Sequence, residues 1–335
     1  MIKTAIIGAS GYTGLELIKL ILAHPKFELS YIANSEGNTT VSSLHPSLKN
    51  ICDLVVHKAD TKEILDSCEL AFLALPHQTS MALAKDLIAG GVVVVDLSAD
   101  YRLELDTYEE YYCPHIDKAN LSKAIYGLPE IYAKELYNAK LIANPGCYPT
   151  ASLLGILPFV SYIKEDSSIF IDAKSGVSGA GKKLSETTHY CTINENIFAY
   201  NPLKHRHAPE IKEKIKKIYN KDLQINFIPH LIPATRGMLC SIYVSLQEEI
   251  DAYEVLKEFY KESKFVRVFN KPVDIKSSSG TNFCDIFATT NKKDLFVSSS
   301  IDNLLRGASS QAVVNANLAF GFEEDLGIVK YAYVP

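Results

Sequence analysis

The first hundred residues alternate between short apolar runs and stretches in which apolar residues recur with helical spacing. Residues 2–7 form an apolar run, and residues 15–22 place their apolar side chains on one helical face. Two further continuous apolar runs, at 70–75 and 92–97, are typical of parallel strands covered on both faces. The pattern predicts an α/β domain with a doubly wound parallel sheet at the start of the chain.

The rhythm of strand, loop and helix is not repeated between residue 148 and about residue 305. Segments 224–228 and 239–245 instead alternate apolar and polar positions, which predicts strands with one solvated or interface face. We therefore expect a second domain of the α+β class. A last helix is predicted from Asn303 to about Phe320, because apolar residues again recur with helical spacing.

Three glycines, Gly8, Gly11 and Gly14, lie between the first predicted strand and the first predicted helix. Glycines at such a turn let the backbone approach a pyrophosphate closely, and the helix N-terminus attracts its negative charge. The spacing predicts a dinucleotide-binding loop, to which Ser10, Tyr12 and Thr13 also belong. The alternative is a tight turn in another kind of α/β domain.

A second strand is predicted at residues 28–33, and the loop that follows it, at 34–39, is where the adenosine ribose of a dinucleotide is expected. Glu36 could accept a hydrogen bond from a ribose 2′-hydroxyl, which favours NAD. Ser35, Asn38 and Thr39 could instead donate to a 2′-phosphate, and the loop contains no arginine. The loop therefore leaves the choice between NAD and NADP open.

Polar residues follow two of the buried strands at the edge where open parallel sheets bind ligands. They are Pro76 and His77 after one strand, and Ser98 to Arg102 after the other. Arg102 is a candidate fork for a carboxylate or phosphate, and its alternative role is that of a surface arginine. We expect His77 to line the cofactor rather than to act as an acid or a base, and we place Ser98 among the cofactor contacts.

Cys147 lies between a turn signal, Asn144 to Gly146, and an apolar segment that predicts a helix opening near Tyr148 and ending before or at Pro158. Unpaired backbone N–H groups and the positive end of a helix dipole favour a thiolate. The position therefore predicts a nucleophile. The alternative is a buried and inert cysteine.

Two histidines and a carboxylate, His205, His207 and Glu210, precede a helix that is predicted to begin near Pro209. Histidine titrates near neutral pH, so this pair is a candidate for acid-base chemistry. The glycine-rich stretch 174–182 is expected to direct backbone donors toward a phosphate or a nicotinamide. It lacks the Walker spacing, which excludes an ATPase of that type.

Composition narrows the class of partner. The 335 residues are 47% hydrophobic and 22% charged with a net charge of -5, which favours a small polar metabolite over nucleic acid. The seven cysteines form no closely spaced set, so neither a disulfide framework nor a metal site is expected. No stretch approaches the length of about 18 uncharged apolar residues that a membrane span needs, and we expect a cytoplasmic protein.

Several motifs taken together resemble those of N-acetyl-gamma-glutamyl-phosphate reductases, which are related to aspartate-semialdehyde dehydrogenases. In order along the chain they are GASGYTG (8–14), DLSADYRL (96–103), YGLPE (126–130), NPGCYPT (144–150), SGVSGAGK (175–182), HRHAPEI (205–211), PHLIPATRGM (229–238) and NLLRGASSQAVVN (303–315). They span nearly the whole chain. The resemblance implies a Rossmann-type NAD(P)-binding domain, 1–147 with 305–335, and an α+β catalytic and oligomerisation domain, 148–304.

The resemblance also implies roles for individual residues. Cys147 would be the nucleophile, Arg102 and Glu210 would contact the substrate, and His205 and His207 would supply acid-base chemistry, with His207 favoured as the base. On the cofactor side it implies Ser178, Gly179 and Asn315, although Asn315 could equally lie on a polar helix face. The implied cofactor is NADP, without a metal, and the implied assembly is a homodimer or homotetramer.

The implied reaction is NADPH-dependent reduction of N-acetyl-glutamyl 5-phosphate to the semialdehyde, with release of phosphate, in arginine biosynthesis. The same chemistry on N-acetyl-aminoadipyl or aspartyl phosphate is an alternative, because one methylene changes only the depth of a pocket. A non-catalytic dinucleotide sensor is an alternative from another class. It would not need Cys147, Arg102, His207 and Glu210 together.

Overall fold

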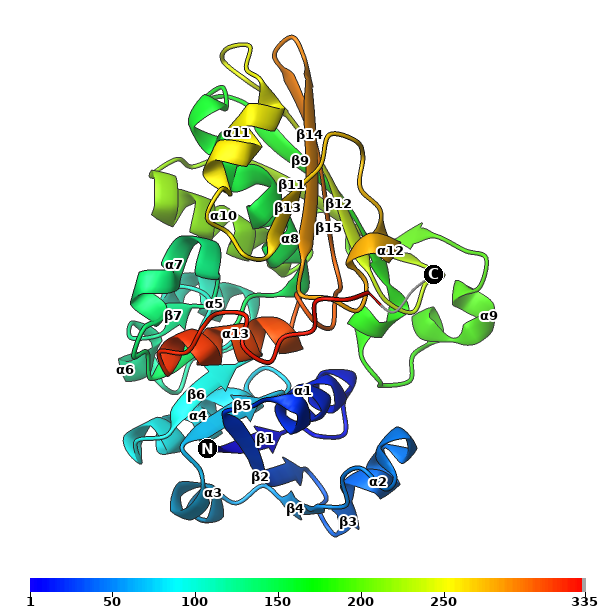
Figure 1. The fold of residues 1–335 in the computed structure, drawn as a ribbon. Helices are drawn as coiled ribbons and strands as arrows, with labels where there is room; N and C mark the ends of the chain where they lie inside the picture. The colour runs from blue at the N-terminus through cyan, green and yellow to red at the C-terminus, as the bar shows by residue number, and fades with distance from the viewer. Residues whose placement is uncertain (333–335) are drawn as a thin grey trace. The chain divides into compact units, whose positions relative to one another are not determined.

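Two β-sheets organise the computed structural model, which describes residues 1–332 (Figure 1). Each sheet belongs to one of two compact units, Met1–Pro145 with Ala308–Ile328, and Gly146–Gly307 with the described residues from Val329 on. The sequence-based division placed residues 146–147, 305–307 and 329–332 in the first part, whereas their contacts place them in the second. Residues 333–335, which that division also assigned, lie outside the described residues.

The first unit contains an eight-stranded sheet in the order β3-β4-β2-β1-β5-β6-β8-β7. The strands are β1 (Ile2–Ile7), β2 (Phe27–Asn34), β3 (Thr39–Thr40), β4 (Val55–Lys58), β5 (Leu70–Leu73), β6 (Val93–Asp96), β7 (Ile125–Tyr126) and β8 (Leu141–Ala143). All neighbouring strands are parallel except β3 and β4. The order reverses around β1, between β2 and β5, and ligands bind beyond the carboxyl ends of strands at such a point.

Helices cover this sheet because the continuous apolar strands leave neither face suited to water. They are α1 (Tyr12–Ala23), α2 (Val41–Leu44), α3 (Thr61–Ser67), α4 (Thr79–Ala89), α5 (Leu105–Tyr111), α6 (Lys118–Leu121), α7 (Pro129–Leu136) and α13 (Ser309–Ala319). The last helix returns from the far end of the chain and packs on α1 and α7. The sequence predicted a helix from Asn303, but residues 303–308 form turns and α13 begins only at Ser309, because the backbone of Ala308 (φ −157°, ψ −85°) is not helical.

The second unit contains a mixed seven-stranded sheet in the order β10-β11-β9-β12-β15-β14-β13. Its strands are β9 (Ser168–Gly176), β10 (Phe198–Ala199), β11 (Gln224–Ile232), β12 (Met238–Ser245), β13 (Val266–Val268), β14 (Cys284–Asn291) and β15 (Asp294–Ile301). Its helices are α8 (Cys147–Ile156), α9 (Tyr190–Ile193), α10 (His207–Tyr219), α11 (Ala252–Phe259) and α12 (Ile275–Ser278). Figure 1 shows α10 and α11 on the same side of the sheet.

The two faces of the second sheet differ in their side chains. Ile242 and Val297 point toward α8, where Gly155 leaves room for the Ile242 side chain. The residues of opposite parity form an aromatic row across three strands, because Phe170 of β9 pairs with Tyr243 of β12, which pairs with Phe296 of β15. Phe170 is 52% exposed and Tyr243 is 49% exposed. The helices therefore position one face for the site and leave the aromatic row on the other.

Candidate active site

Two helix N-termini meet in the second unit, and both carry candidate catalytic residues. α8 begins at Cys147 and α10 begins at His207, with Glu210 in its first turn. The buried Glu210 carboxylate joins the helices, because its Oε1 accepts a 3.2 Å hydrogen bond from the N–H of Gly146. Positive helix dipole ends and backbone donors thus converge where an anion would be stabilised.

Cys147 occupies the position that the sequence predicted, at the start of a short buried helix that ends before Pro158. Cys147 itself is partly exposed, whereas the rest of α8 is buried. Gly307 lies against Cys147, because a Cβ added to Gly307 would be only 2.6 Å from the Cβ of Cys147. A thiol that is accessible at a helix N-terminus is suited to nucleophilic attack as a thiolate.

His205 lies in an aromatic cluster and is held by the backbone. Its ring centroid is 5.6 Å from that of Tyr148, 5.5 Å from that of Tyr200 and 5.4 Å from that of Phe227. Its Nδ1 accepts a 3.2 Å hydrogen bond from the N–H of His207. Burial, with a smaller effect of the Arg206 charge, lowers the pKa of His205 to about 4. His205 is therefore a neutral imidazole at pH 7, with its hydrogen on Nε2.

His207 has a different setting from its neighbour. It is the first residue of α10, it is partly buried, and its ring lies 4.8 Å from that of His205 and 5.8 Å from that of Tyr148. The structure brings Cys147, His205, His207 and Glu210 to one end of the second unit. The backbone also links the two histidines, because Nδ1 of His205 accepts from the N–H of His207.

Arg102 belongs to the first unit, where it is buried at the carboxyl end of the sheet. Its Nε donates to the carbonyl oxygen of Asn144 at 2.7 Å, and its Nη2 donates to that of Leu97 at 2.7 Å. Both acceptors follow parallel strands, β8 and β6. Arg102 therefore positions the segment that leads into Cys147, a function the sequence did not suggest.

The same segment is held from α13. Asn315 is fully buried, and its Nδ2 donates to the carbonyl oxygen of Gly127 at 2.9 Å and to Oδ1 of Asn144 at 3.0 Å. Its Oδ1 has no hydrogen-bond partner among the described residues. The amide nitrogen is therefore committed to the protein. Only the oxygen of Asn315 is left for a hydrogen bond with a ligand.

The glycine loop has the geometry that a pyrophosphate requires. Gly8 has φ +99°, and an added Cβ there would overlap the carbonyl oxygen of Ala74. An added Cβ on Gly14 would overlap the carbonyl oxygen of Gly8, so these two glycines allow the backbone to pack closely within the loop. Gly11, the N-cap of α1, is more open, because the nearest atom to an added Cβ there would be the carbonyl oxygen of Gly8 at 3.7 Å. This fits a dinucleotide phosphate.

Asn34, at the end of β2, links the glycine loop to the ribose loop. Its Nδ2 donates to Oγ of Ser10 at 3.0 Å, and its Oδ1 accepts from the N–H groups of Glu36 and Gly37 at 2.9 and 2.6 Å. Its sequence signal was an asparagine at the end of the second strand. Ser35 is exposed beside it. Lys58 of β4 pairs in register with Asn34, which brings a basic residue to this loop from a distant part of the sequence.

Tyr12 and Thr13, the other predicted residues of the glycine loop, differ in their environment. Tyr12 is 39% exposed, and the carbonyl oxygen of Thr13 accepts a 3.0 Å hydrogen bond from Oγ of Ser309 in α13.

Ser98 is buried, and its hydroxyl is engaged by the protein. It donates to Oδ2 of Asp96 at 2.7 Å and accepts from the N–H of Asp100 at 3.0 Å. Burial raises the pKa of Asp96 to about 6. The N–H of Ala99 donates to Nδ1 of His77 at 2.9 Å, so His77 supports the loop. These hydrogen bonds hold the loop that carries Arg102. The sequence motifs did not reveal them.

The glycine-rich turn at 176–179 lies in the stretch 174–182, whose backbone donors were expected to face a phosphate or a nicotinamide. Three of these donors, the N–H groups of Gly176, Val177 and Ser178, instead donate to the carbonyl oxygens of residues 237, 234 and 235, at 2.9, 2.8 and 3.2 Å. Sequence could not show this, because the acceptors come from a loop about sixty residues further on. Ser178 is buried, whereas the next residue, Gly179, is exposed.

Residues 1–332 contain no group of three or more histidine, cysteine, aspartate or glutamate residues arranged to hold a metal ion. None of the helices in that range is both long enough and apolar enough to cross a membrane.

Comparisons with known proteins agree with this organisation. Residues 3–139 match the NAD binding domain of semialdehyde dehydrogenases, and residues 147–303 match their dimerisation domain. Aspartate semialdehyde dehydrogenase II from Vibrio cholerae has the same fold, with a TM-score of 0.73 at 17% identity over 95% of this chain and 98% of that chain. The enzyme from Candida albicans, solved with NADP, gives a TM-score of 0.72 at 15% identity over the same shares. The fold and the matched domains define a protein of the semialdehyde dehydrogenase class, which confirms the predicted fold class.

The relatives narrow the class further. The N-acetyl-gamma-glutamyl-phosphate reductase of Sulfurovum sp. is 61% identical over the full length of both chains, and that of Sulfurimonas denitrificans is 58% identical over 100% of this chain and 99% of its own. The chain belongs to the N-acetyl-gamma-glutamyl-phosphate reductase family and is an oxidoreductase, as the motifs predicted.

Proposed function

We propose that this enzyme reduces N-acetyl-L-glutamyl 5-phosphate to N-acetyl-L-glutamate 5-semialdehyde with NADPH, releasing phosphate, as a step of arginine biosynthesis in the cytoplasm. The observation that carries the proposal is the junction of α8 and α10, which presents Cys147, His207 and Glu210 at two helix N-termini. The names of the full-length relatives support the choice of substrate.

Cys147 opens the proposed reaction as a thiolate. Its sulfur attacks the acyl carbon, and the bond from that carbon to the phosphate oxygen breaks, so that phosphate leaves with the electron pair. The product is a thioester on Cys147. Backbone N–H groups at the helix N-termini stabilise the charge that develops on the carbonyl oxygen. Bound NADPH supplies the hydride that reduces the acyl group.

His207 is the general acid and base for the carbonyl oxygen in this scheme. It donates a proton as negative charge builds up there and takes the proton back as the bond between carbon and sulfur breaks. The aldehyde then leaves and Cys147 is again a thiolate. His205 stays neutral and holds the backbone of His207 through its Nδ1. Arg102 and Glu210 orient the substrate and the segments on either side of the thiol.

The cofactor proposal rests on the loop around Asn34. Ser10, Gly11, Tyr12, Thr13 and Gly14 hold the phosphates, and Ser35 lies beside the ribose. Lys58 supplies the positive charge that a 2′-phosphate needs, since it pairs with Asn34 in the sheet. Ser178, Gly179 and Asn315 are proposed on the nicotinamide side. Ser98 contributes through its carbonyl oxygen, because its hydroxyl and its N–H already donate to Asp96.

The aromatic row of the second sheet is the proposed dimer interface. Phe170, Tyr243 and Phe296 form an apolar strip on the face opposite α8, and large exposed aromatic side chains are typical of association surfaces. The matched dimerisation domain supports a homodimer through this face.

The test of the function is the reverse reaction. Purified enzyme receives acetylglutamate, acetylaminoadipate or aspartate semialdehyde with phosphate and NADP or NAD, and reduced cofactor is followed by its absorbance. We expect the highest kcat/KM with acetylglutamate semialdehyde and NADP. A higher kcat/KM with another aldehyde would show that the acyl phosphate of that compound, rather than N-acetyl-glutamyl 5-phosphate, is the substrate. Binding of NADP without turnover of any aldehyde would favour a sensor.

The nucleophile is tested by Cys147→Ser, with Cys191→Ser as the matched control. Cys191 is an exposed cysteine of the same unit. We expect the first variant to lose phosphate-dependent activity while it still binds NADP, and the control to keep full activity. Substantial turnover by Cys147→Ser would refute the thioester.

A further inference from the structure

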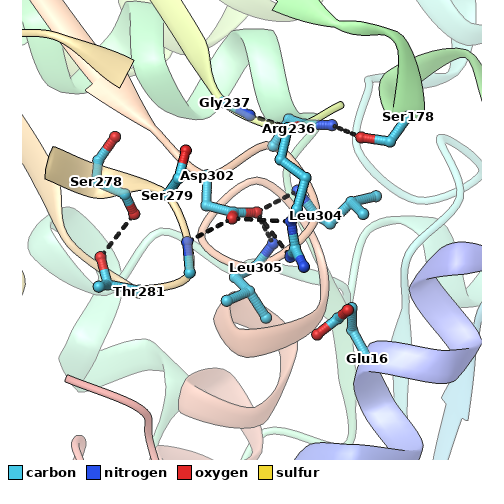
Figure 2. A network of polar contacts seen from close by, with 12 residues as sticks. Glu16, Ser178, Arg236, Gly237, Ser278, Ser279, Thr281, Asp302, Leu304 and Leu305 are labelled. Atoms are coloured by element: carbon cyan, nitrogen blue, oxygen red, sulfur yellow. Dashed lines mark hydrogen bonds and ion pairs between the residues drawn. The ribbon is translucent and has the colours of Figure 1, made fainter. Parts of the chain in front are cut away.

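Asp302 anchors a loop of the second unit through a fully buried carboxylate. Its Oδ1 and Oδ2 bind Nη2 and Nε of Arg236, each at 3.1 Å (Figure 2). It also accepts from the N–H groups of Gly280 at 2.7 Å and of Leu304 and Leu305 at 2.9 Å. The ion pair offsets the cost of burying the charge, and the backbone bonds fix the turn from residue 302 to residue 305.

Asn303, the next residue, connects this turn to the glycine-rich turn. Its side chain is buried, its Oδ1 accepts from the N–H of Gly237 at 2.8 Å, and its Nδ2 donates to Oγ of Ser178 at 3.0 Å. A backbone N–H can only donate, so the oxygen of the amide must face Gly237 and the nitrogen must face Ser178. The orientation of the Asn303 amide is therefore determined by its partners.

This orientation has a consequence for the Ser178 hydroxyl. Its oxygen accepts from Asn303, so its own hydrogen points elsewhere, and within residues 1–332 no acceptor for that hydrogen is found. Ser178 is followed by the exposed Gly179, on which a side chain would contact Ser175 and Asn303. The turn thus holds one oriented, largely buried hydroxyl donor next to the exposed Gly179.

We propose that Asn303 is a positioning residue that keeps the Ser178 hydroxyl available as a hydrogen-bond donor to the carboxamide oxygen of the bound nicotinamide. The inference rests on the proposed function, because it takes the glycine-rich turn as the cofactor side of the site. Asp302 and Arg236 hold the backbone of Asn303 in place. A purely structural role for the same contacts is the competing explanation.

The decisive variant is Asn303→Asp. The introduced carboxylate keeps the acceptor for Gly237 but can no longer donate, so the Ser178 hydroxyl would turn to donate to the carboxylate and be lost to the cofactor. Ser178→Ala removes the donor directly. The matched control is Asp285→Asn, which alters another buried pair of the same unit, in which Arg267 binds Asp285 at 2.6 and 2.8 Å.

Three measurements separate positioning from structure. Fluorescence titration gives the Kd of NADPH without substrate, and the same titration uses the thionicotinamide analogue, whose sulfur is a poor acceptor. The rate at which iodoacetamide alkylates Cys147 in the absence of cofactor measures the reactivity of the thiol. We expect Asn303→Asp and Ser178→Ala each to weaken NADPH binding about tenfold, in line with one hydrogen bond, and to weaken binding of the analogue much less. Alkylation should be unchanged.

The proposal would be overturned if the variants lost equal affinity for NADPH and for the analogue, or if Asp285→Asn lost as much affinity for NADPH. The contacts of Asn303 would then be purely structural. Normal NADPH binding by Ser178→Ala would overturn the proposal as well. These titrations need no turnover. Failure of the wild-type enzyme to reduce the acyl phosphate would instead reject the proposed function and leave the binding result standing.

Discussion

The neutral state of His205 leads to a quantitative prediction about pH. Its pKa is about 4 in the folded protein, because burial disfavours the charged ring, and the reference value is 6.5. The unfolded chain therefore binds a proton from about pH 6.5 downward, whereas the folded protein binds it only near pH 4. Lowering the pH through this window favours the unfolded state. Between pH 7 and pH 5 the loss in unfolding free energy from this one residue is about 2 kcal/mol.

The perturbation is His205→Asn, which removes the titration and leaves Oδ1 to accept from the N–H of His207. We expect urea unfolding, followed by circular dichroism, to show a loss of stability between pH 7 and pH 5 that is about 2 kcal/mol smaller in the variant than in the wild type. Contributions of the remaining groups cancel in this difference.

Carbon-13 labelled histidine gives a direct check by NMR, with the variant assigning the resonance of His205. A pKa of 6 or above, or identical pH dependence of both proteins, would refute the reasoning about burial. The kinetic counterpart is that His205→Asn keeps the acidic ionisation of the kcat/KM profile, whereas His207→Asn loses it.

Three further changes test other parts of the structure. Gly307→Ala should lower unfolding free energy by about 1–3 kcal/mol and slow alkylation of Cys147, because the new Cβ would lie 2.6 Å from that of Cys147; normal stability and reactivity would contradict the packing. Lys58→Gln should raise KM for NADP about tenfold and leave KM for NAD unchanged, and parallel changes would remove Lys58 from the 2′-phosphate site. Tyr243→Asp should shift light scattering from dimer to monomer mass, whereas an unaltered mass would exclude the aromatic row as the interface.

Much of the first unit could be predicted because its signals are local. A strand, a glycine turn and a helix lie next to one another in residues 2–22, and each is specified by its own apolar spacing. The start of α8 was equally predictable, since Gly146 and Pro149 define the turn and the first helical positions around Cys147. The motifs also identified the family, because they combine over nearly the whole chain.

The glycine-rich turn and the last helix show where local reasoning failed. The donors of Gly176 to Ser178 looked available for a ligand, but the 234–237 loop uses them. The helix expected from Asn303 begins at Ser309, because the backbone of Ala308 is not helical. For the glycine-rich turn the acceptors are about sixty residues away in sequence, so no pattern within the segment could reveal them.

The sequence by itself determined the first strand, glycine turn and helix, the position of Cys147 at a helix start and the family, because periodicity and short motifs are properties of neighbouring residues. Only the tertiary structure buried His205 so that its ring is neutral, brought Lys58 beside Asn34 and oriented Asn303 between Gly237 and Ser178. Burial, register and the direction of a hydrogen bond depend on which distant segments meet. They are decided when the chain packs.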